Sequence, residues 1–414
     1  MLKDSHPLDS QIDLPPATAR PATVLHDWAG ALVAARWLWV SGSVFLITRL
    51  GIALVAYLGW VLFPAATDPA PYHLRPPDNI LLDVFGSRWD TGFYVSIVEE
   101  GYIAEGMPLP SVAFFPLMPL LMRVALPLTG DAVTAGMLVA NVALLFAIML
   151  FYRLVDMQWG PKVADRAVWY LLIFPTAFFG SAIYSESVFL LCAIGALYFA
   201  RKGKWWLAAL FGVGATATRF VGLIVVPMLI MEWWQQRVSE TSTYRPGYRA
   251  LLAPLLAPLG TASFMLYLWR RFQDPLAFIN ASEAWGRVPQ SVVETLTTLL
   301  TRPDQGWLTA ILNGQVHVND WFDFLIVLIF LALGFVLLYQ HRWSEGIFVW
   351  MGALIPLSSG LLMSQRRYVW VLFPAFILLA QWGKHPWLDR LITTLFLVGL
   401  ALFTALFANG YWVA

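Results

Sequence analysis

Long apolar segments separated by short polar ones fill most of the chain. A membrane-spanning helix needs roughly 20 predominantly apolar residues, and this pattern predicts about eleven spans, within a range of about ten to thirteen. Some of the segments are shorter than a perpendicular span. The candidate spans are 37–63, 132–152, 164–180, 184–200, 204–217, 219–235, 250–269, 321–340, 345–362, 368–383 and 390–410.

Composition supports a membrane protein. Hydrophobic residues make up 59% of the 414 residues and charged residues 12%, about half the charged fraction of a soluble chain. The net charge is +1 and no stretch is strongly basic, so we expect no nucleic-acid partner. The single cysteine, Cys192, lies in an apolar run and predicts neither a disulfide nor a cysteine metal site. The expected fold class is an all-α polytopic membrane protein.

The chain divides into two parts by composition. Residues 1–30 are polar and rich in Pro and Ala, which predicts a disordered tail, and residues 31–414 form a single transmembrane domain. If the tail is cytoplasmic, most short loops on its side are basic, as the positive-inside rule requires. Two long loops, 65–131 and 270–320, then lie on the outer side.

One apolar segment in the first long loop leaves an alternative open. Residues 111–128 carry three prolines, and we interpret them as a helix in the outer interface. If they span the membrane instead, every later loop changes side and the bias of the loop cations is lost.

Ionisable residues gather on the side of the long loops, where each is costly enough to suggest a function. Residues 88–100 predict a short helix with Trp89, Phe93 and Ile97 on an apolar stripe, settled at the headgroup level. The other clusters are Tyr184–Glu186, Arg219 and Gln365–Tyr368, and the 270–287 loop adds Arg287.

Each of these residues also has a purely structural interpretation. Asp90 could cap a helix that starts at Thr91, and Glu186 could pair with Arg219. The remaining alternatives are a solvated helix end for Glu99 and Glu100, snorkelling to headgroups for Arg366 and Arg367, and an aromatic belt for Trp89 and Trp285.

The functional interpretation places the clusters around one cavity at the membrane surface. Arginines bind phosphate oxygens in a bidentate manner and stay charged. A carboxylate can accept the proton of an attacking hydroxyl, and aromatic faces can cover a sugar ring. Such a cavity suits a substrate whose phosphate is linked to a lipid.

Several motifs resemble those of the PIG-V-type mannosyltransferases. WDTGFYVSIVEEGY (89–102) resembles the family's W-D-x-x-[HF]-[YF]-x-x-I-A-x-x-G-Y signature, although Val98 replaces the usual alanine and Glu100 stands where histidine is frequent. Further segments that look like family blocks are AFFPLMPLL (113–121), FPTAFFGSAIYSESVFL (174–190), GVGATATRFVG (212–222), QDPLAFINASEAWGR (273–287) and RRYVWVLFPAF (366–376).

The resemblance implies a GT-C glycosyltransferase that inverts the anomeric centre and acts at the non-cytoplasmic face. The donor would be a polyprenyl-phosphate mannose, and the acceptor a glycolipid or a surface glycan or protein. Asp90 matches the usual catalytic base. The donor phosphate would bind Arg219, Arg366 and Arg367, and the sugar or acceptor would contact Arg88, Trp89, Tyr94, Glu99, Glu100, Tyr184, Glu186, Trp285 and Arg287.

No cofactor is expected, although Asp90 with Glu99 or Glu100 could bind a divalent cation. Two other functions stay open. One is a GT-C enzyme for another lipid-linked sugar. The other is a flippase or transporter of lipid-linked substrates, which would need ionisable or polar groups deep in the spans, where only Arg49 and Asn141 qualify. We expect a multi-pass protein of the plasma membrane if bacterial, or of the endoplasmic reticulum if eukaryotic, with a cytoplasmic N-terminus.

Overall fold

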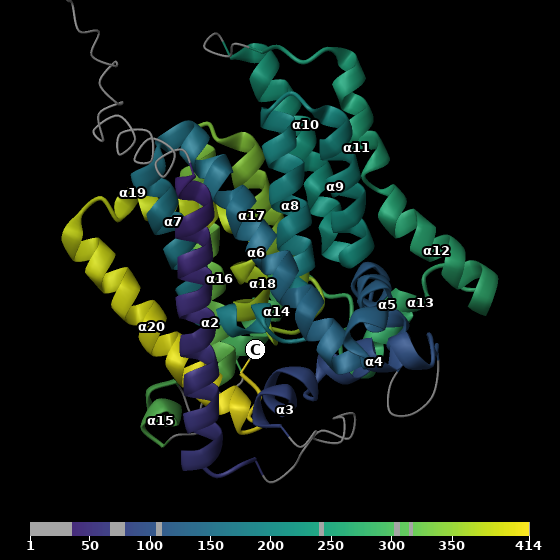
Figure 1. Cartoon of the computed structure of the whole chain (residues 1–414), viewed down its shortest axis with the longest axis vertical. Helices are drawn as coiled ribbons and strands as arrows, with labels where there is room; N and C mark the ends of the chain where they lie inside the picture. The colour runs from purple at the N-terminus through teal and green to yellow at the C-terminus, as the bar shows by residue number, and fades with distance from the viewer. Residues whose placement is uncertain are drawn as a thin grey trace, which may run out of the picture.

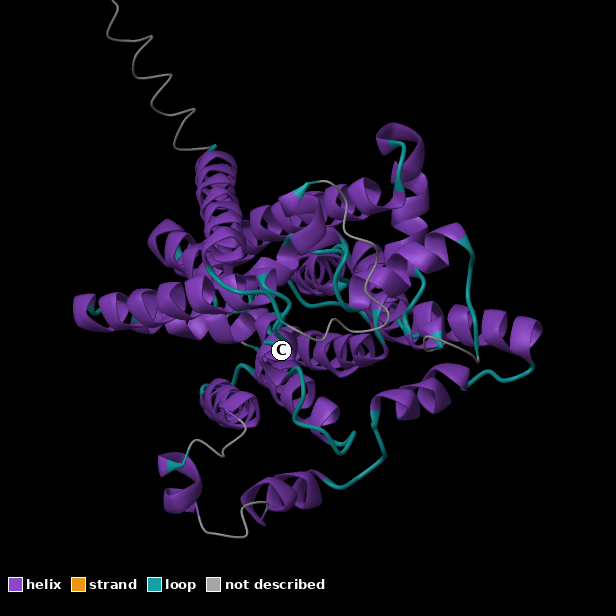
Figure 2. Ribbon diagram, turned by 90° about the horizontal axis from the view of Figure 1, so that it is seen from below, coloured by secondary structure: helices purple, strands orange, loops and turns teal. Residues whose placement is uncertain are grey.

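The computed structural model describes residues 35–66, 79–104, 110–239, 244–301, 307–313 and 318–413. All regular elements in this part of the chain are helices, as Figure 2 shows, which confirms the predicted all-α class. The predicted tail, 1–30, lies outside the described residues.

Figure 1 shows the helices coloured in chain order, from purple near the N-terminus to yellow at the C-terminus. The α-helices are α2 (Arg36–Leu62), α3 (Ile80–Gly86), α4 (Asp90–Glu99), α5 (Leu117–Thr129), α6 (Ala132–Trp159), α7 (Pro161–Ile173), α8 (Glu186–Arg201), α9 (Trp205–Thr218), α10 (Val225–Val238), α11 (Leu252–Leu256), α12 (Leu259–Phe272), α13 (Ala277–Ala281), α14 (Val292–Thr301), α15 (Trp307–Leu312), α16 (Val318–Tyr339), α17 (Trp343–Leu357), α18 (Gln365–Trp370), α19 (Phe373–Trp382) and α20 (Pro386–Ala408). The 3₁₀ turns are η1 (Ser111–Ala113), η2 (Ala177–Gly180), η3 (Phe220–Ile224), η4 (Tyr248–Leu251) and η5 (Ser282–Trp285).

Five helical segments among the described residues are long and apolar enough to cross a membrane. They are Arg36–Leu62, Ala132–Trp159, Tyr248–Phe272, Asn319–Tyr339 and Pro386–Ala408, and each coincides with a predicted span. The other predicted spans fall on shorter helices, some followed by 3₁₀ turns, as where α7 gives way to η2. The chain is therefore a polytopic membrane protein.

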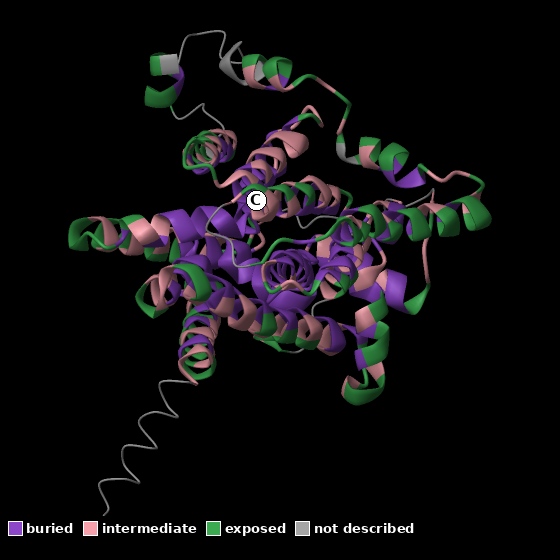
Figure 3. Cartoon of the chain, turned by 90° about the horizontal axis from the view of Figure 1, so that it is seen from above, coloured by how far each residue is buried: buried purple, intermediate pink, exposed green. Residues whose placement is uncertain are grey.

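Side-chain burial separates the centre of the bundle from its outer surface. Figure 3 shows buried residues gathered in the middle and exposed ones on the outer helices. On α2, large apolar side chains such as Ile47, Leu50 and Leu54 are exposed, and Leu395 and Val398 are exposed on α20. Apolar side chains on the outer face of a bundle fit a lipid environment rather than water.

The polar segment after α2 is packed inside the protein, so the apolar stripe that was predicted to rest on lipid headgroups contacts other parts of the chain instead. On α4, Phe93, Tyr94 and Ile97 are buried. Its last carbonyls accept hydrogen bonds from Arg123 on α5, at 2.8 Å from Nη2 to Ile97 O and 3.2 Å from Nε to Val98 O. The apolar residues do recur at steps of four along α4, but residues on its other sides, such as Thr91 and Val95, are buried as well.

Helix α5 covers most of the apolar segment 111–128. Its 13 residues make a helix about 20 Å long, which is short against a hydrocarbon core of about 30 Å. Leu120, Val124 and Leu128 are exposed, whereas Met118 and Met122 are fully buried. A helix of this length with one exposed apolar face agrees with the interfacial interpretation.

Candidate active site

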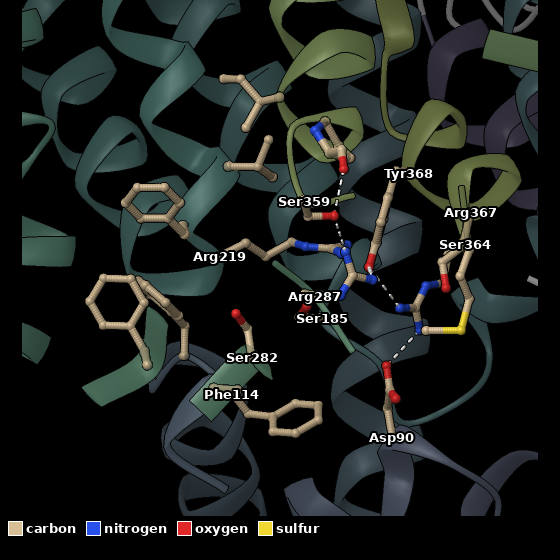
Figure 4. A pocket seen from close by; sticks show the side chains of 18 of the residues that line it. Asp90, Phe114, Ser185, Arg219, Ser282, Arg287, Ser359, Ser364, Arg367 and Tyr368 are labelled. Carbon is tan, nitrogen blue, oxygen red and sulfur yellow. Dashed lines mark hydrogen bonds and ion pairs between the residues drawn. The ribbon is translucent and has the colours of Figure 1, made fainter. Parts of the chain in front are cut away.

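A cavity of ≈ 960 Å³ opens at the end of the bundle where α4 begins. Its walls come from segments far apart in the sequence: the start of α4, the start of α8, the junction of α9 and η3, the segment around η5, the region between α17 and α18, and Trp412. Part of the wall is charged, as Figure 4 shows. Another part is apolar and includes Phe114, Phe220, Phe278 and Ile355.

A chain of alternating charges lies along one wall of this cavity. Arg367 donates from Nη1 to Asp90 Oδ2 at 2.6 Å, and its Nε lies 3.3 Å from Glu186 Oε1. Arg219 Nη1 donates to the same Glu186 oxygen at 2.6 Å. The prediction that Glu186 pairs with Arg219 is confirmed, and the Glu186 carboxylate joins two arginines that lie 148 residues apart (367 − 219).

The two carboxylates of this chain differ in access. The Glu186 side chain is 1% exposed, whereas that of Asp90 is 22% exposed. Glu186 is therefore held between its arginines, while Asp90 presents its carboxylate to the cavity. A substrate hydroxyl can reach Asp90 far more easily than Glu186.

Tyr368 brings a third arginine to the same place. Arg287 donates from Nη2 to the Tyr368 hydroxyl at 2.9 Å and from Nη1 to Ser359 Oγ at 3.0 Å. The guanidiniums of Arg219 and Arg367 lie 5.0 and 5.2 Å from the centroid of the Tyr368 ring, within range for cation–π attraction. Sequence reasoning placed Tyr368 in a polar cluster but gave it no role.

Tyr94 comes one turn after Asp90 on α4, so the two share a helix face, and Tyr94 also lines the cavity. Burial, reinforced by the nearby Glu186 carboxylate, raises the pKa of the Tyr94 phenol well above its ordinary value. The phenol therefore keeps its proton at physiological pH. Tyr184 likewise lines the cavity and is almost completely buried.

Two cavity residues have backbone conformations that L-residues rarely adopt. Trp89, directly before Asp90, has φ 50°, and Ser364, at the N-cap of α18, has φ 74°. Such conformations cost on the order of 1–3 kcal/mol and persist only where packing enforces them. The Trp89 ring packs against Phe407 and Trp412, with centroids 4.9 and 5.3 Å away. The C-terminal residues thus help to fix the start of α4.

The structure decides between the two interpretations of Asp90. Helix α4 begins at Asp90 itself, its N-cap is Trp89, and no side chain caps it. The Asp90 carboxylate pairs with Arg367 instead. The prediction that Asp90 caps a helix starting at Thr91 is wrong.

Arg366 corrects a second prediction, because it does not line the cavity. Its Nε donates to Asp323 Oδ1 at 2.8 Å and its Nη2 to Asn319 Oδ1 at 3.0 Å, both on α16. Arg366 and Arg367 are both buried in ion pairs, so neither snorkels to the surface. Consecutive residues of a helix point about 100° apart, which sends these two side chains to different partners.

Arg88, Glu99 and Glu100 also lie away from the cavity lining. Arg88 pairs with Asp83 at 2.7 Å, and Glu99 and Glu100 are exposed at the far end of α4, in agreement with a solvated helix end. The side chain of Trp285 lies outside the described part of the structure. Of the predicted contacts, the cavity is lined by Trp89, Asp90, Tyr94, Tyr184, Glu186, Arg219, Arg287 and Arg367.

The two polar residues deep in the spans have structural partners. Arg49 donates to Ala177 O at 3.0 Å and to Ser181 Oγ at 3.1 Å, and Ser181 Oγ in turn donates to Asn141 Oδ1 at 3.0 Å. Arg49 thereby donates hydrogen bonds to carbonyl groups that have lost their helical partners where α7 gives way to η2. Neither Arg49 nor Asn141 lines the cavity.

Among the described residues, no three His, Cys, Asp or Glu side chains come together as a possible metal site. Asp90 and Glu99 stand at opposite ends of α4, so they do not form the carboxylate pair considered from the sequence. Independence of metal ions stays a prediction.

The fold and the cavity define a polytopic membrane protein with a buried ionic site at one end of its bundle. A family model described as "Mannosyltransferase (PIG-V)" matches residues 62–278, just over half of the chain. The chain belongs to this family.

Curated relatives match part of this chain. GPI alpha-1,6-mannosyltransferase 2 of Cricetulus griseus is 32% identical over 207 residues, covering 46% of this chain and 41% of the relative. GPI mannosyltransferase 2 of Cryptococcus neoformans is 30% identical over 169 residues, covering 38% of this chain and 37% of the relative. The chain spans less than half the length of the curated relatives it matches.

Two solved structures are similar at low identity. ArnT from Cupriavidus metallidurans, bound to undecaprenyl phosphate, is 13% identical with a TM-score of 0.48, covering 89% of this chain and 76% of that one. The archaeal oligosaccharyltransferase AglB from Archaeoglobus fulgidus, in complex with an inhibitory peptide and a dolichol-phosphate, is 12% identical with a TM-score of 0.42, covering 91% and 56%.

Proposed function

We propose that the protein is a glycosyltransferase that moves mannose from a polyprenyl-phosphate mannose to an acceptor hydroxyl, with inversion at the anomeric carbon. The observation that carries the proposal is the Asp90 carboxylate, which faces a cavity containing three arginines. Membership of the mannosyltransferase family favours mannose over another sugar.

The cavity has a place for each part of such a donor. The arginines suit the phosphate, because guanidinium–phosphate hydrogen bonds are charge-assisted. The apolar wall suits the first units of the lipid: the rings of Phe220 and Phe278 lie 5.5 Å apart, and Phe220 is 45% exposed at the edge of the cavity. Trp89 and Trp412, beside Asp90, offer aromatic surface to a sugar.

Asp90 acts as the general base in this mechanism. It accepts the proton of the acceptor hydroxyl while that oxygen forms a bond to C1 of mannose. The bond between C1 and the phosphate oxygen breaks, and its electron pair leaves with the polyprenyl phosphate. Attack from the face opposite the phosphate inverts the configuration and gives an α-mannoside from a β-linked donor.

The charge chain couples the two halves of this reaction. Before the reaction, Asp90 balances part of the Arg367 charge. When Asp90 takes a proton, that positive charge is released just as the phosphate gains negative charge. Cations fixed in advance near a developing charge are typically a large part of catalysis.

We place this reaction at the non-cytoplasmic face of the membrane, with the N-terminus in the cytoplasm, because loop cations favour that orientation. The acceptor would be a glycolipid or a surface glycan or protein. Arginines and Asp90 suffice for the chemistry, so the reaction would need no metal ion.

The test is mannose transfer by the purified full chain in detergent, with radiolabelled polyprenyl-phosphate mannose and an extract of membrane glycolipids as acceptor. We expect transfer by the wild type, loss of transfer in Asp90→Asn, and sensitivity of the product to α-mannosidase. Glu99→Gln is the matched control, because Glu99 is an exposed carboxylate on the same helix.

Parallel reactions contain EDTA or other polyprenyl-phosphate sugars. Full activity in EDTA is the expected result. Transfer of glucose or arabinose but not mannose would contradict the proposal that the donor carries mannose. Full activity of Asp90→Asn would overturn the site.

A further inference from the structure

We propose that Arg287 is the residue that binds the phosphate of the lipid-linked substrate. This inference rests on the proposed function and deepens it, because sequence reasoning had grouped Arg287 with the sugar or acceptor. Arg287 lies beyond the residues matched by the family model, which end at 278.

The first argument is the charge balance of the cavity wall. Asp90 and Glu186 are paired with Arg219 and Arg367, so these four side chains sum to zero charge. Arg287 has no carboxylate within 4.0 Å among the described residues, and its side-chain partners there are the neutral hydroxyls of Ser359 and Tyr368. Glu283 also lines the cavity but is exposed and forms no ion pair with Arg287. Arg287 thus offers a positive charge without a carboxylate partner to the single negative charge of a phosphodiester.

The second argument compares Arg287 with the other arginines. Arg366 is engaged by Asp323 and Asn319, outside the cavity lining. Arg367 is 5% exposed and shared between two carboxylates. Arg219 shares Glu186 and stacks over Tyr368. A phosphate binding to Arg219 or Arg367 competes with a carboxylate, whereas at Arg287 it competes only with hydroxyl oxygens.

The third argument is that Arg287 is held in place before any ligand arrives. Val288 N donates to Ser359 O at 3.1 Å, and Gln290 N donates to Ser358 O at 3.0 Å. The packing is close, because a Cβ at Gly360, which has φ 73°, would lie 2.9 Å from Val288 O. These contacts tie the segment 286–290, which we call the strap, to the end of α17. A cation fixed in advance loses little freedom on binding.

The fourth argument is that the same stretch of chain also supplies apolar wall. Phe278, Ile279 and Val288 line the cavity together with Arg287, and the ring of Phe278 packs against Phe115 at 5.2 Å. Residues 278–288 thus present a cation and an apolar surface to one cavity. This combination suits a phosphate that is attached to a lipid.

Figure 4 shows how this cation lies relative to the proposed base. Arg287 and Arg219 converge beside Tyr368, and Arg367 lies between Tyr368 and Asp90. A phosphate on Arg287 would also be within reach of Arg219. The sugar attached to it would then extend toward Asp90.

The experiment measures binding rather than transfer. The purified full chain in detergent is titrated with polyprenyl phosphate and, separately, with the uncharged polyprenol of the same length. The variants are Arg287→Gln, Arg287→Lys and, as the matched control, Arg270→Gln, which changes an exposed arginine at the end of α12. Size-exclusion elution and the unfolding temperature confirm that each variant is folded.

We expect Arg287→Gln to weaken binding of polyprenyl phosphate by about tenfold or more and to leave polyprenol binding unchanged. Arg287→Lys should retain part of the preference for the phosphate, and Arg270→Gln all of it. Unchanged affinity of Arg287→Gln for polyprenyl phosphate would overturn the inference. So would an equal loss for both lipids, or a wild type that does not prefer the phosphate.

This outcome is separable from the proposed function. If the wild type transfers no mannose but Arg287→Gln loses its preference for the phosphate, the phosphate site stands and the donor sugar is wrong. If mannose is transferred and Arg287→Gln keeps its preference for the phosphate, the proposed function stands and Arg287 is not the phosphate site.

Discussion

Each end of helix α8 carries a cluster of ion pairs made of two arginines and two carboxylates. At its first residue, Glu186 joins Arg219 and Arg367, with Asp90 beyond. At its last residue, Arg201 lies 3.2 Å from Glu232 and 3.1 Å from Glu345, and Arg342 also pairs with Glu345. The 16 residues of α8 separate these clusters by about 24 Å.

The clusters differ in what surrounds them. Around the Arg201 cluster the neighbours are protein groups: Ser344 Oγ donates to Glu232 at 2.7 Å, Gln236 Nε2 donates to Glu232 at 2.9 Å, and Arg201 donates to Gln158 at 2.9 Å. Both of its carboxylates are buried, and none of its members lines the cavity. The Asp90 cluster instead has one carboxylate open to the cavity and a third arginine beside it.

Burial of ion pairs alone therefore does not distinguish a structural cluster from a functional one. A balanced cluster enclosed by protein ties helices together. A cluster with one accessible member and one cation without a carboxylate partner can take up a charged ligand. The predictions below test this distinction by changing equivalent residues in the two clusters.

The largest effect is expected for Glu186→Gln. This change leaves Arg219 without its carboxylate partner and weakens the placement of Arg367. Removing one partner of a buried pair costs about 3–5 kcal/mol of stability, and displaced cations should lower the transfer rate roughly a hundredfold. Unfolding temperature and transfer rate per folded molecule measure the two losses, and normal transfer by this variant would break the comparison.

Glu345→Gln should lower stability alone. It removes the carboxylate between Arg201 and Arg342, so the free energy of unfolding should fall by about 3–5 kcal/mol. The unfolding temperature in detergent checks this. Any loss of transfer per folded molecule beyond about twofold would contradict independence of the two ends.

A smaller effect is expected for Tyr368→Phe. The change keeps the ring beneath Arg219 but removes the hydroxyl that accepts a hydrogen bond from Arg287. With its placement loosened, the donor KM should rise roughly threefold to tenfold. Steady-state kinetics at several donor concentrations separates a change in KM from a change in kcat. An unchanged KM would contradict the role of the Tyr368 hydroxyl in positioning Arg287.

Glu100→Gln should have no measurable effect. Glu100 is exposed at the end of α4 and does not line the cavity. Transfer and unfolding temperature should both match the wild type, as expected for a surface substitution. A loss of activity would instead support the contact between Glu100 and the substrate that was predicted from the sequence.

Much of the fold followed from the hydrophobic pattern. Length and apolarity located the five long spans, and motif order placed Asp90, Glu186, Arg219 and Arg367 around one cavity. The four-residue spacing of Tyr94 from Asp90 also places both on one helix face. These features depend on local sequence and on the alternation of sides in a membrane protein.

What the sequence did not reveal depends on tertiary packing. Two adjacent arginines look equivalent in sequence, but packing against α16 turned Arg366 to Asp323 and left Arg367 for Asp90. The stripe on α4 suggested a surface helix, because sequence does not show how many sides a helix buries. The ion pairs of Arg201 were not predicted, since its partners Glu232 and Glu345 lie on two other helices, α10 and α17.

The most direct test compares the transfer rate per folded molecule of Asp90→Asn with that of Glu345→Gln. If the cavity end holds the catalytic base, Asp90→Asn should lose at least about a hundredfold in kcat and keep an unfolding temperature near that of the wild type. Glu345→Gln should show lower stability with nearly normal kcat. An Asp90→Asn variant with normal kcat, or a Glu345→Gln variant that is stable but inactive, would contradict the assignment of catalysis to Asp90.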